Sequence, residues 1–411
     1  MVEWKEYTVA DVISTVIDYR GKTPKKLGGE WSDSGYRALS AKNIKTGKIV
    51  QLDSIRYVSE EMYKYWMKEE VQKEDIIITS EAPFGQIYYW DSDEKIVLSQ
   101  RLFAVRVNQR FYPKYIYFYM TSSFFQAELA GRATGTTVVG LRQPELLKCK
   151  IFAPDYQEQK RIADTLWCLE QKINNNEEIN NNLEQQALVL FRHYFMDFEP
   201  YGCCAPSNWS KVSLDDVCTR ITDGSHYSPS DVPGAPYPMY SVKNMETYGF
   251  NSTSCKHITA EDFHKMQKND CIPRLNDILV AKDGSYLKEI FICSEEKDEA
   301  ILSSIAIFRP NTEVIIPEIL LYLLKQPSIR KDVGDNYVSG SALPRIVLKD
   351  FKKYTFLLPP MTEQLKIGAV LHAIRMQTKE NIDEIQNLSA LRDTLLPQLM
   401  SGKLDVSDID L

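Results

Sequence analysis

The sequence of 411 residues lacks the features that mark membrane and secreted proteins. No apolar run approaches the roughly 18 residues of a membrane span, and the first residues lack the charged, apolar and small-residue order of a signal peptide. The eight cysteines show no paired spacing and stand mostly among apolar residues, which is typical of reduced, buried thiols. We therefore expect a cytoplasmic protein without disulfides.

Motifs that carry catalysis are also missing. The chain has no Gly-x4-Gly-Lys-Ser/Thr phosphate loop, no Gly-x-Gly-x-x-Gly after a strand, no His-Glu-x-x-His and no Gly-x-Ser-x-Gly. The cofactor loop of methyltransferases and their Asn/Asp-Pro-Pro-aromatic motif are absent as well. We therefore expect no catalytic residue.

Two weaker patterns bear on metal chemistry. The run from Pro154 to Lys160 looks like the Pro-Asp…Glu-x-Lys set of metal-dependent nucleases, but helix capping explains Asp155 and Glu158 equally well. The second half of the chain has Leu365 where that lysine would recur. A zinc set is conceivable too, although the two-residue knuckle spacings of strong zinc motifs are missing. Its members would be Cys255, His257, His264 and Cys271. We expect no metal site.

The chain also lacks a net positive charge. The 49 basic and 56 acidic residues give a formal net charge of -7, whereas a protein that grips phosphates alone is usually basic. A local basic face or a partner subunit would reconcile this charge with nucleic-acid binding.

What the chain does have is a long heptad seam that occurs twice. Apolar or small residues recur at alternating steps of four and three, which indicates a coiled coil. Adding 205 to each residue number gives a second seam without insertion or deletion. The first seam is Ile162, Leu166, Leu169, Ile173, Asn176, Asn180, Leu183, Ala187 and Leu190; the second is Ile367, Leu371, Ile374, Thr378, Asn381, Ile385, Leu388, Arg392 and Leu395.

The seams predict two rods that pair antiparallel with each other. Asp155 with Glu158, and Thr362 with Glu363 and Gln364, offer helix starts, and rods of roughly 35 to 39 residues would be on the order of 55 Å long. Asn176 and Asn381 hold the same seam position, where a polar side chain fixes register. We expect Asn176 near the crossing of the second rod. The alternative is two long surface helices that do not contact each other.

The rest of the chain is also duplicated. Each half reads as a mixed α/β (α+β) globule, and the two tandem globules, with their paired helices, would have pseudo-two-fold symmetry. The predicted division is 1–153 for the first globule, 154–198 for the first long helix, 199–208 for a linker, 209–358 for the second globule, 359–400 for the second long helix and 401–411 for a C-terminal tail.

Matching polar loops follow strand-like runs in both halves, including the glycine-rich loops 131–140 and 334–340. Such loops suit DNA, because Arg or Lys pairs with guanine, Asn or Gln with adenine, and hydroxyls with phosphates. Ordinary turns are the structural alternative. The DNA-contact candidates are Arg20, Lys22, Thr23, Lys42, Asn43, Ser80 to Gln86 and Arg142 in the first half, and His226, Lys243, Asn244, Lys282 to Ser285, Tyr286 and Arg345 in the second.

Taken together, the chain resembles the specificity (S) subunit of type I restriction-modification systems. The resemblance covers the whole chain; its helix-start and C-terminal motifs are quite specific, and the Gly-Lys-Thr-Pro run is less so. It rests on Arg20-Gly21-Lys22-Thr23-Pro24, on Asp223-Gly224-Ser225-His226-x-Ser-Pro229, on Pro360-x-x-Glu363-Gln364, and on Leu391-Arg392-Asp393-x-Leu395-Leu396-Pro397-x-Leu399-x-Ser401-Gly402-Lys403-Leu404. The first half departs by one residue, as Pro154-x-x-x-Glu158-Gln159.

The resemblance implies two target-recognition domains, each reading half of a bipartite site in double-stranded DNA, with helices that set the gap. It implies two modification (M) subunits, which bind S-adenosylmethionine and methylate adenine, and restriction (R) subunits that join through them and use ATP and Mg. This chain would bind no cofactor. The rival from another class is a coiled-coil adaptor with two protein-binding modules, and a nuclease is the third alternative.

Overall fold

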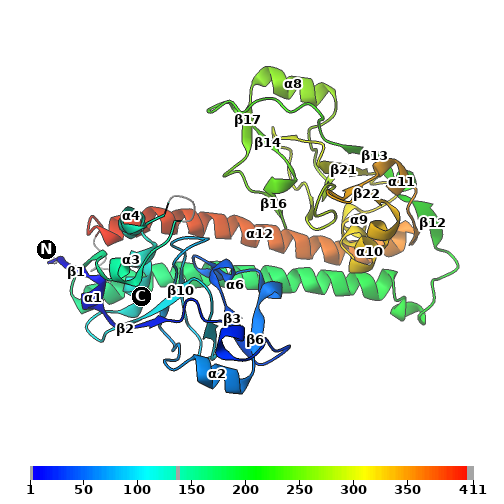
Figure 1. The fold of residues 1–411 in the computed structure, drawn as a ribbon. Helices are drawn as coiled ribbons and strands as arrows, with labels where there is room; N and C mark the ends of the chain where they lie inside the picture. Colours follow the sequence, from blue (N-terminus) through cyan, green and yellow to red (C-terminus); the bar gives the residue numbers. More distant parts are fainter. Residues whose placement is uncertain (1–2, 136–138, 405–411) are drawn as a thin grey trace. The chain divides into compact units, whose positions relative to one another are not determined.

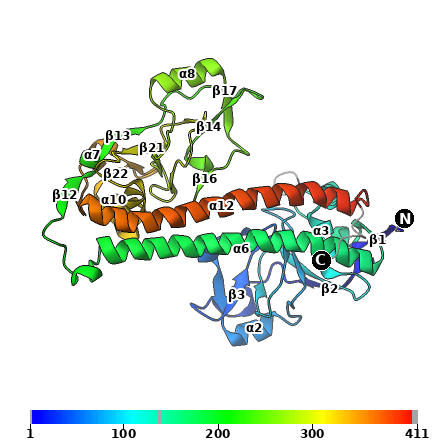
Figure 2. The same cartoon turned by 180° about the vertical axis from the view of Figure 1, so that it is seen from behind.

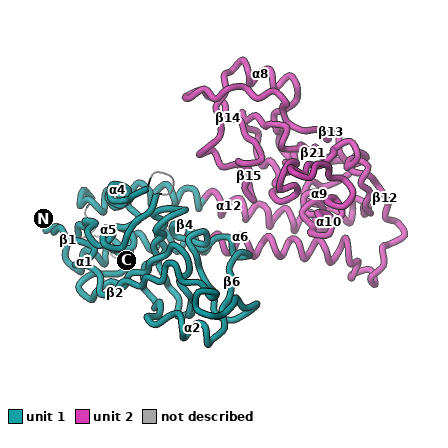
Figure 3. Tube along the Cα trace, in the orientation of Figure 1, with its two compact units in different colours: residues 1–175, 384–411 teal, residues 176–383 magenta. Residues whose placement is uncertain are grey.

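The computed structural model describes residues 3–135 and 139–404, and the chain divides into two compact units (Figure 3). Unit 1 comprises residues 1–175 and 384–411, and unit 2 comprises residues 176–383. Each unit therefore contains one globule and one half of each long helix. Parts of two predicted segments, 136–138 of the first glycine-rich loop and 405–411 of the tail, lie outside the described residues.

The globule of unit 1 is built around a mixed set of short strands and helices. Its central sheet has the order β2 (Ile13–Asp18), β10 (Leu102–Val107), β7 (Ile76–Thr79) and β8 (Ile87–Tyr89). Smaller sheets are β6 (Arg56–Val58), β3 (Tyr36–Leu39) and β9 (Val97–Leu98), the ribbon β1 (Lys5–Thr8) with β11 (Lys150–Ala153), and the hairpin β4 (Ile44–Lys45) with β5 (Lys48–Ile49). The helices are α1 (Val9–Val12), α2 (Glu60–Trp66), α3 (Pro113–Thr121), α4 (Ser123–Arg132), α5 (Gln143–Leu147), and the 3-10 turns η1 (Lys25–Leu27), η2 (Ala41–Asn43) and η3 (Leu52–Ser54).

Unit 2 repeats this plan. Its central sheet has the order β13 (Cys218–Asp223), β21 (Ile305–Pro310), β18 (Ile278–Ala281) and β19 (Ile290–Ile292). Smaller sheets are β17 (Lys256–Ile258), β14 (Tyr237–Tyr240) and β20 (Ala300–Ile301), then β12 (Ser210–Ser213) with β24 (Thr355–Leu358), β15 (Met245–Glu246) with β16 (Gly249–Phe250), and β22 (Val338–Ser339) with β23 (Arg345–Ile346). The helices are α7 (Leu214–Val217), α8 (Ala260–Lys268), α9 (Pro317–Leu324), α10 (Pro327–Asn336), α11 (Leu348–Phe351), and the 3-10 turns η4 (Glu199–Tyr201) and η5 (Val242–Asn244).

Both faces of each central sheet are buried, which explains the unbroken apolar runs in its strands. In β7 the side chains of Ile76 and Ile78 join the core beneath α3 and the long helices, while Ile77 joins the core under the second sheet. In β18 Ile278 and Val280 face one core, and Leu279 faces the other. This alternation follows from the two-residue period of a strand.

The two long helices are α6 (Tyr156–Phe195) and α12 (Met361–Met400), and within each unit they run antiparallel (Figures 1 and 2). In unit 1, Arg392 donates to Glu170 at 2.8 Å, and the core that contains Leu166 also contains Leu399. In unit 2, the core around Ala187 and Phe191 includes Leu371. Every predicted seam position is buried or half-buried. The predicted fold class, with two mixed α/β globules and an antiparallel helix pair, is confirmed.

A buried glutamine ties the start of each long helix to its globule. Gln159 Nε2 donates to the Pro154 carbonyl, and its Oε1 accepts from the backbone of Tyr112, the residue before α3. Gln364 donates to the Pro359 carbonyl and accepts from the residue before α9 in the same way. The structural repeat is thus Pro-x-x-x-Glu-Gln in both halves, and the first half does not depart from the second.

One sequence prediction about these helices needs correction. Asp155 caps α6, since its Oδ1 accepts from the Glu158 backbone at 3.0 Å, but Thr362 lies inside α12, which already begins at Met361. Asn381 Nδ2 donates to Asn180 Oδ1 at 2.8 Å, and Asn176 is buried on the same seam, where its role in fixing the register stays a prediction. Antiparallel packing brings together seam positions at different places in the repeat, which the offset of 205 cannot reveal.

The cysteine prediction holds only in part. All eight described cysteines are free, but three of them, Cys168, Cys203 and Cys204, are exposed rather than buried. Cys168 lies on the outer face of α6, and the other two follow η4 in the segment between the halves.

We predict that Asn381→Ala destabilises the helix pair by about 1–3 kcal/mol, because the buried Asn180 amide then loses its partner. Asn387, which is exposed on the same helix, provides the matched control, and Asn387→Ala should change stability by less than about 0.5 kcal/mol. Urea unfolding followed by circular dichroism measures both. Equal effects of the two variants would show that the Asn180 contact is unimportant.

Candidate nucleic-acid interface

One end of each central sheet is closed by buried ion pairs. In unit 1, the Arg106 guanidinium forms a fork on Asp75, with both N–O distances at 2.9 Å, and its other nitrogen reaches Glu69. Asp75 is fully buried at the start of β7. The fork therefore ties β10 to the segment that precedes β7.

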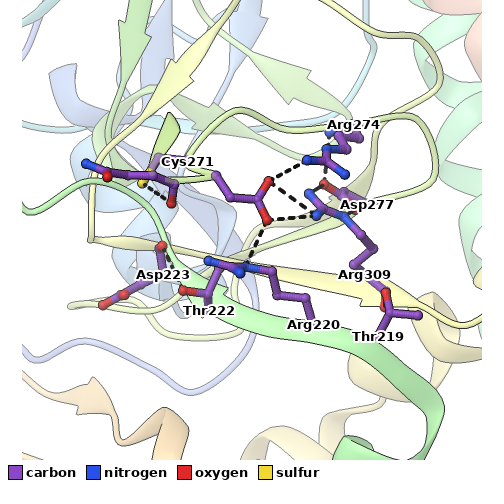
Figure 4. A network of polar contacts seen from close by, with 10 residues as sticks. Thr219, Arg220, Thr222, Asp223, Cys271, Arg274, Asp277 and Arg309 are labelled. Atoms are coloured by element: carbon purple, nitrogen blue, oxygen red, sulfur yellow. Dashed lines mark hydrogen bonds and ion pairs between the residues drawn. The ribbon is translucent and has the colours of Figure 1, made fainter. Parts of the chain in front are cut away.

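The same fork recurs in unit 2, within a larger network (Figure 4). Arg309 binds Asp277 through two contacts of 2.8 Å, and it also contacts Asp270 at 3.0 Å. Arg220 and Arg274 add ion pairs to Asp270 at 3.0 and 2.9 Å. We call this end of each sheet the locked end.

Burial and hydrogen bonding act in opposite directions on these groups. Burial raises the pKa of Asp75 more than the hydrogen bonds from Arg106 lower it, whereas the hydrogen bond to Asp277 raises the pKa of Arg309. A raised carboxyl pKa means that ionisation of Asp75 does not by itself favour folding at neutral pH. The fork therefore acts mainly by fixing the position of the strand.

The opposite end of the unit 1 sheet gathers three of the predicted loops. Ser80 donates its backbone N–H to Arg101, and its carbonyl accepts from Leu141. Arg20 forms a fork on Asp18, donates to the Leu141 carbonyl at 3.0 Å, and stacks 3.9 Å from the centre of the Phe103 ring. We call this the open end, because three loops meet there.

The open end of unit 2 is assembled from the equivalent loops. Lys282 Nζ lies 2.6 Å from Asp223 and 3.9 Å from Asp283. His226 Nε2 also contacts Asp223, at 3.2 Å. Asp18 and Asp223 hold equivalent positions in the two halves. In unit 1 the aspartate pairs with Arg20 of the loop that follows β2, whereas in unit 2 it pairs with Lys282 of the loop that follows β18.

The predicted DNA-contact residues divide into two groups by their placement. Side chains of the first group hold the loops together; for example, buried Asn43 caps η2 and donates to Ser54 at 3.0 Å. Side chains of the second group reach the surface or are half-buried. The inner group is Arg20, Asn43, Ser80, Gln86, Asn244 and Lys282, and the outer group is Lys22, Thr23, Lys42, Arg142, His226, Lys243, Ser285, Tyr286 and Arg345.

The structure adds cations that the sequence comparison of the two halves missed. Arg101 has a left-handed backbone (φ 65°) and an exposed side chain 3.8 Å from Glu81, and unit 2 has Ser304 in its place. Lys25 and Lys26 are exposed on η1 beside Lys22. Comparison of the two halves could not find these residues, because no matching basic residues stand 205 positions later in the sequence. The signal that could have found them is a basic run that occurs in one half only.

Comparison with known proteins connects this repeated arrangement to a family. The family described as type I restriction modification DNA specificity domain matches residues 1–185 and 206–388, most of both halves. The chain belongs to this family. Its two globules are therefore DNA specificity domains, and its role is DNA sequence recognition in a type I restriction-modification system.

Individual relatives match this chain over most of their length. The MjaIX specificity subunit of Methanocaldococcus jannaschii is 23% identical over 95% of this chain and 91% of that protein. The EcoKI specificity subunit of Escherichia coli is 20% identical over 97% of this chain and 89% of its own. The crystal structure of the S subunit from M. genitalium has the same fold, with a TM-score of 0.59, 16% identity and coverage of 97% and 96%.

Other kinds of site are not found in the part of the chain that the structure describes. Among residues 3–135 and 139–404, no three or more His, Cys, Asp or Glu side chains form a group that could hold a metal ion. Within the same residues no helix has the length and apolar character needed to cross a membrane.

We predict that Arg309→Met destabilises the specificity chain by about 3–5 kcal/mol, because Asp277 would remain fully buried without its cation. The control is Arg274→Ala at the same locked end, where the arginine side chain is 58% exposed and its removal should change stability by less than about 1 kcal/mol. Thermal unfolding of the full chain compares the two variants. A smaller loss for Arg309→Met would contradict the proposed role of the fork.

We predict that Arg345→Ala, at the open end, weakens DNA binding without lowering stability. A base contact should relax one position of the recognised sequence by about 1–3 kcal/mol, whereas a phosphate contact should weaken all sequences and reduce the salt slope by about one. Arg274→Ala, at the locked end, should bind as the unaltered chain does. Unchanged affinity and salt slope for Arg345→Ala would remove this residue from the interface.

Proposed function

We propose that each globule reads one half of a bipartite DNA site through the loops at its open end. The observation that carries this proposal is the repetition of one arrangement: in both units the same sheet end collects exposed cations, including Arg101, Arg142 and Arg345. Arginine reads guanine or binds phosphate, and the inner residues hold the loops in place. Which outer residues contact bases stays a prediction.

We also propose that the chain contributes recognition and no chemistry of its own. Two modification subunits would bind S-adenosylmethionine and methylate adenine, and restriction subunits with ATP and Mg would join through them, in the cytoplasm. Neighbouring subunits that enclose the duplex also account for the net charge of -7. Their phosphate contacts would supplement those of this chain.

The paired helices would set the gap between the two half-sites and support the modification subunits. Two facts favour this role: α6 and α12 each pass without interruption from one unit into the other, and polar contacts hold their register within each unit. These contacts are Asn180 with Asn381 in unit 2 and Glu170 with Arg392 in unit 1. A flexible linker would need neither feature.

An insertion that tests this role must avoid contacts inside either unit. A position such as Glu184 is unsuitable, because Glu184 binds Lys325 at 2.8 Å within unit 2. The insertion belongs between Asn175 and Asn176 in α6, matched by one between Asp383 and Glu384 in α12, where the units meet in sequence.

We predict that inserting Leu-Glu-Ala-Gln at both places keeps the two half-site sequences and lengthens the gap by one or two base pairs. One added helical turn is about 6 Å long, and B-DNA rises about 3.4 Å per base pair. Methylation profiling of the assembled complex gives both quantities. Altered half-sites with an unaltered gap would show that the helices do not set the spacing.

The test of the function itself is selection from random duplexes in the presence of the modification subunits. An enriched bipartite sequence is the expected result, and enrichment of none would favour the adaptor. Membership of a DNA specificity family already argues against that alternative.

A further inference from the structure

Each unit exposes a branched apolar side chain at the open end of its sheet. Leu343 in the turn between β22 and β23 is 52% exposed, and Val139 in the equivalent segment of unit 1 is 46% exposed. Ala342 and Pro344 flank Leu343 in the sequence, and the exposed Arg345 follows them.

The Leu343 turn is held rigidly against the loop after β18. The Lys282 carbonyl accepts from Ile346, and the Gly284 N–H donates to the Pro344 carbonyl at 2.7 Å. Gly340 has a φ of 89°, and a side chain there would approach the Leu343 carbonyl to 2.8 Å. Leu343 is therefore fixed beside the outer residues Ser285 and Arg345.

The equivalent segment of unit 1 is held in the same way. Leu141 donates to the Ser80 carbonyl at 3.0 Å, and Gly140 forms bridges with Glu81 and Thr134. By these contacts Leu141 corresponds to Ile346 and Val139 to Pro344, so the position that corresponds to Leu343 lies outside the described residues. Arg142, which follows Leu141, is exposed.

We propose that Leu343 is a specificity-determining residue that contacts the C5-methyl group of a thymine in the half-site read by unit 2. This inference rests on the proposed DNA-reading role of the open end. A leucine side chain has no hydrogen-bonding group, and the thymine methyl is the apolar feature of base edges in the major groove. The surrounding cations bind phosphate or guanine, so an apolar contact adds the ability to read thymine.

The alternative DNA contact is a wedge between two base pairs. Apolar wedges unstack a base step and kink the duplex, and they act from the minor groove. A wedge would respond to the flexibility of the step and not to the methyl group. The two modes can therefore be separated by a chemical change in the DNA that removes only the methyl.

The experiment uses the full chain assembled with the modification subunits and a duplex that carries its selected bipartite sequence. Each thymine of the half-site read by unit 2 is replaced in turn by deoxyuridine, and binding is measured for the unaltered chain and for Leu343→Ala. One substitution should weaken binding of the unaltered chain about fourfold, as expected for one buried methyl group. The same substitution should have no effect on Leu343→Ala, because the contact is already lost.

Two control variants accompany this comparison of thymine and deoxyuridine duplexes. Leu275→Ala replaces a leucine that is 50% exposed beside the locked end, and it should keep the full discrimination between thymine and deoxyuridine. Leu343→Val keeps an apolar side chain and should retain part of that discrimination, which guards against a misfolded Leu343→Ala variant.

The outcomes separate the two proposals. Failure to select any bipartite sequence overturns the proposed function. A selected sequence with discrimination that survives Leu343→Ala overturns only the thymine contact. A third outcome also overturns the thymine contact: Leu343→Ala lowers the affinity equally for thymine and deoxyuridine duplexes, and a 2-aminopurine in the duplex reports that the unaltered chain unstacks a base step. That result identifies a wedge.

Discussion

The antiparallel packing of α6 against α12 is the constraint on which the rest of the structure depends. Each unit completes its core with half of one helix and half of the other, so Leu166 and Leu399 share a core although they are far apart in sequence. Neither globule is closed by its own half of the sequence. The duplication therefore produces two interdependent units and not two independent domains in a row.

Within each unit the central sheet has two ends with different physical properties. Buried arginine forks on Asp75 and Asp277 tie adjacent segments together at the locked end, where a change of geometry would leave a charge without a partner. At the open end, backbone hydrogen bonds and the ion pairs of Asp18 and Asp223 hold the loops. The proposed DNA contacts would therefore be carried by loops on a sheet that is fixed at its other end.

The residue types of the loops did not show which of their side chains hold the loops together and which reach the surface. Asn43 and Asn244 match at the same place in both halves because each caps a 3-10 turn, which is a structural reason for the match. Arg20 and Lys282 have the chemistry of base readers, but each binds an equivalent aspartate of its own unit. Arg101 and Leu343 lacked any motif, and only their exposure beside these loops draws attention to them.

Residue spacing predicts the elements that depend on local periodicity: two long helices with their seams, strands with unbroken apolar runs, and the duplication with its offset of 205. These follow from spacing along one segment, which the sequence states directly. Packing between distant segments sets which seam residues meet, as with Asn180 and Asn381, and which polar side chains are inner or outer. Such choices depend on the direction of packing and on distances between segments far apart in the chain, and neither is encoded in the spacing of any one segment.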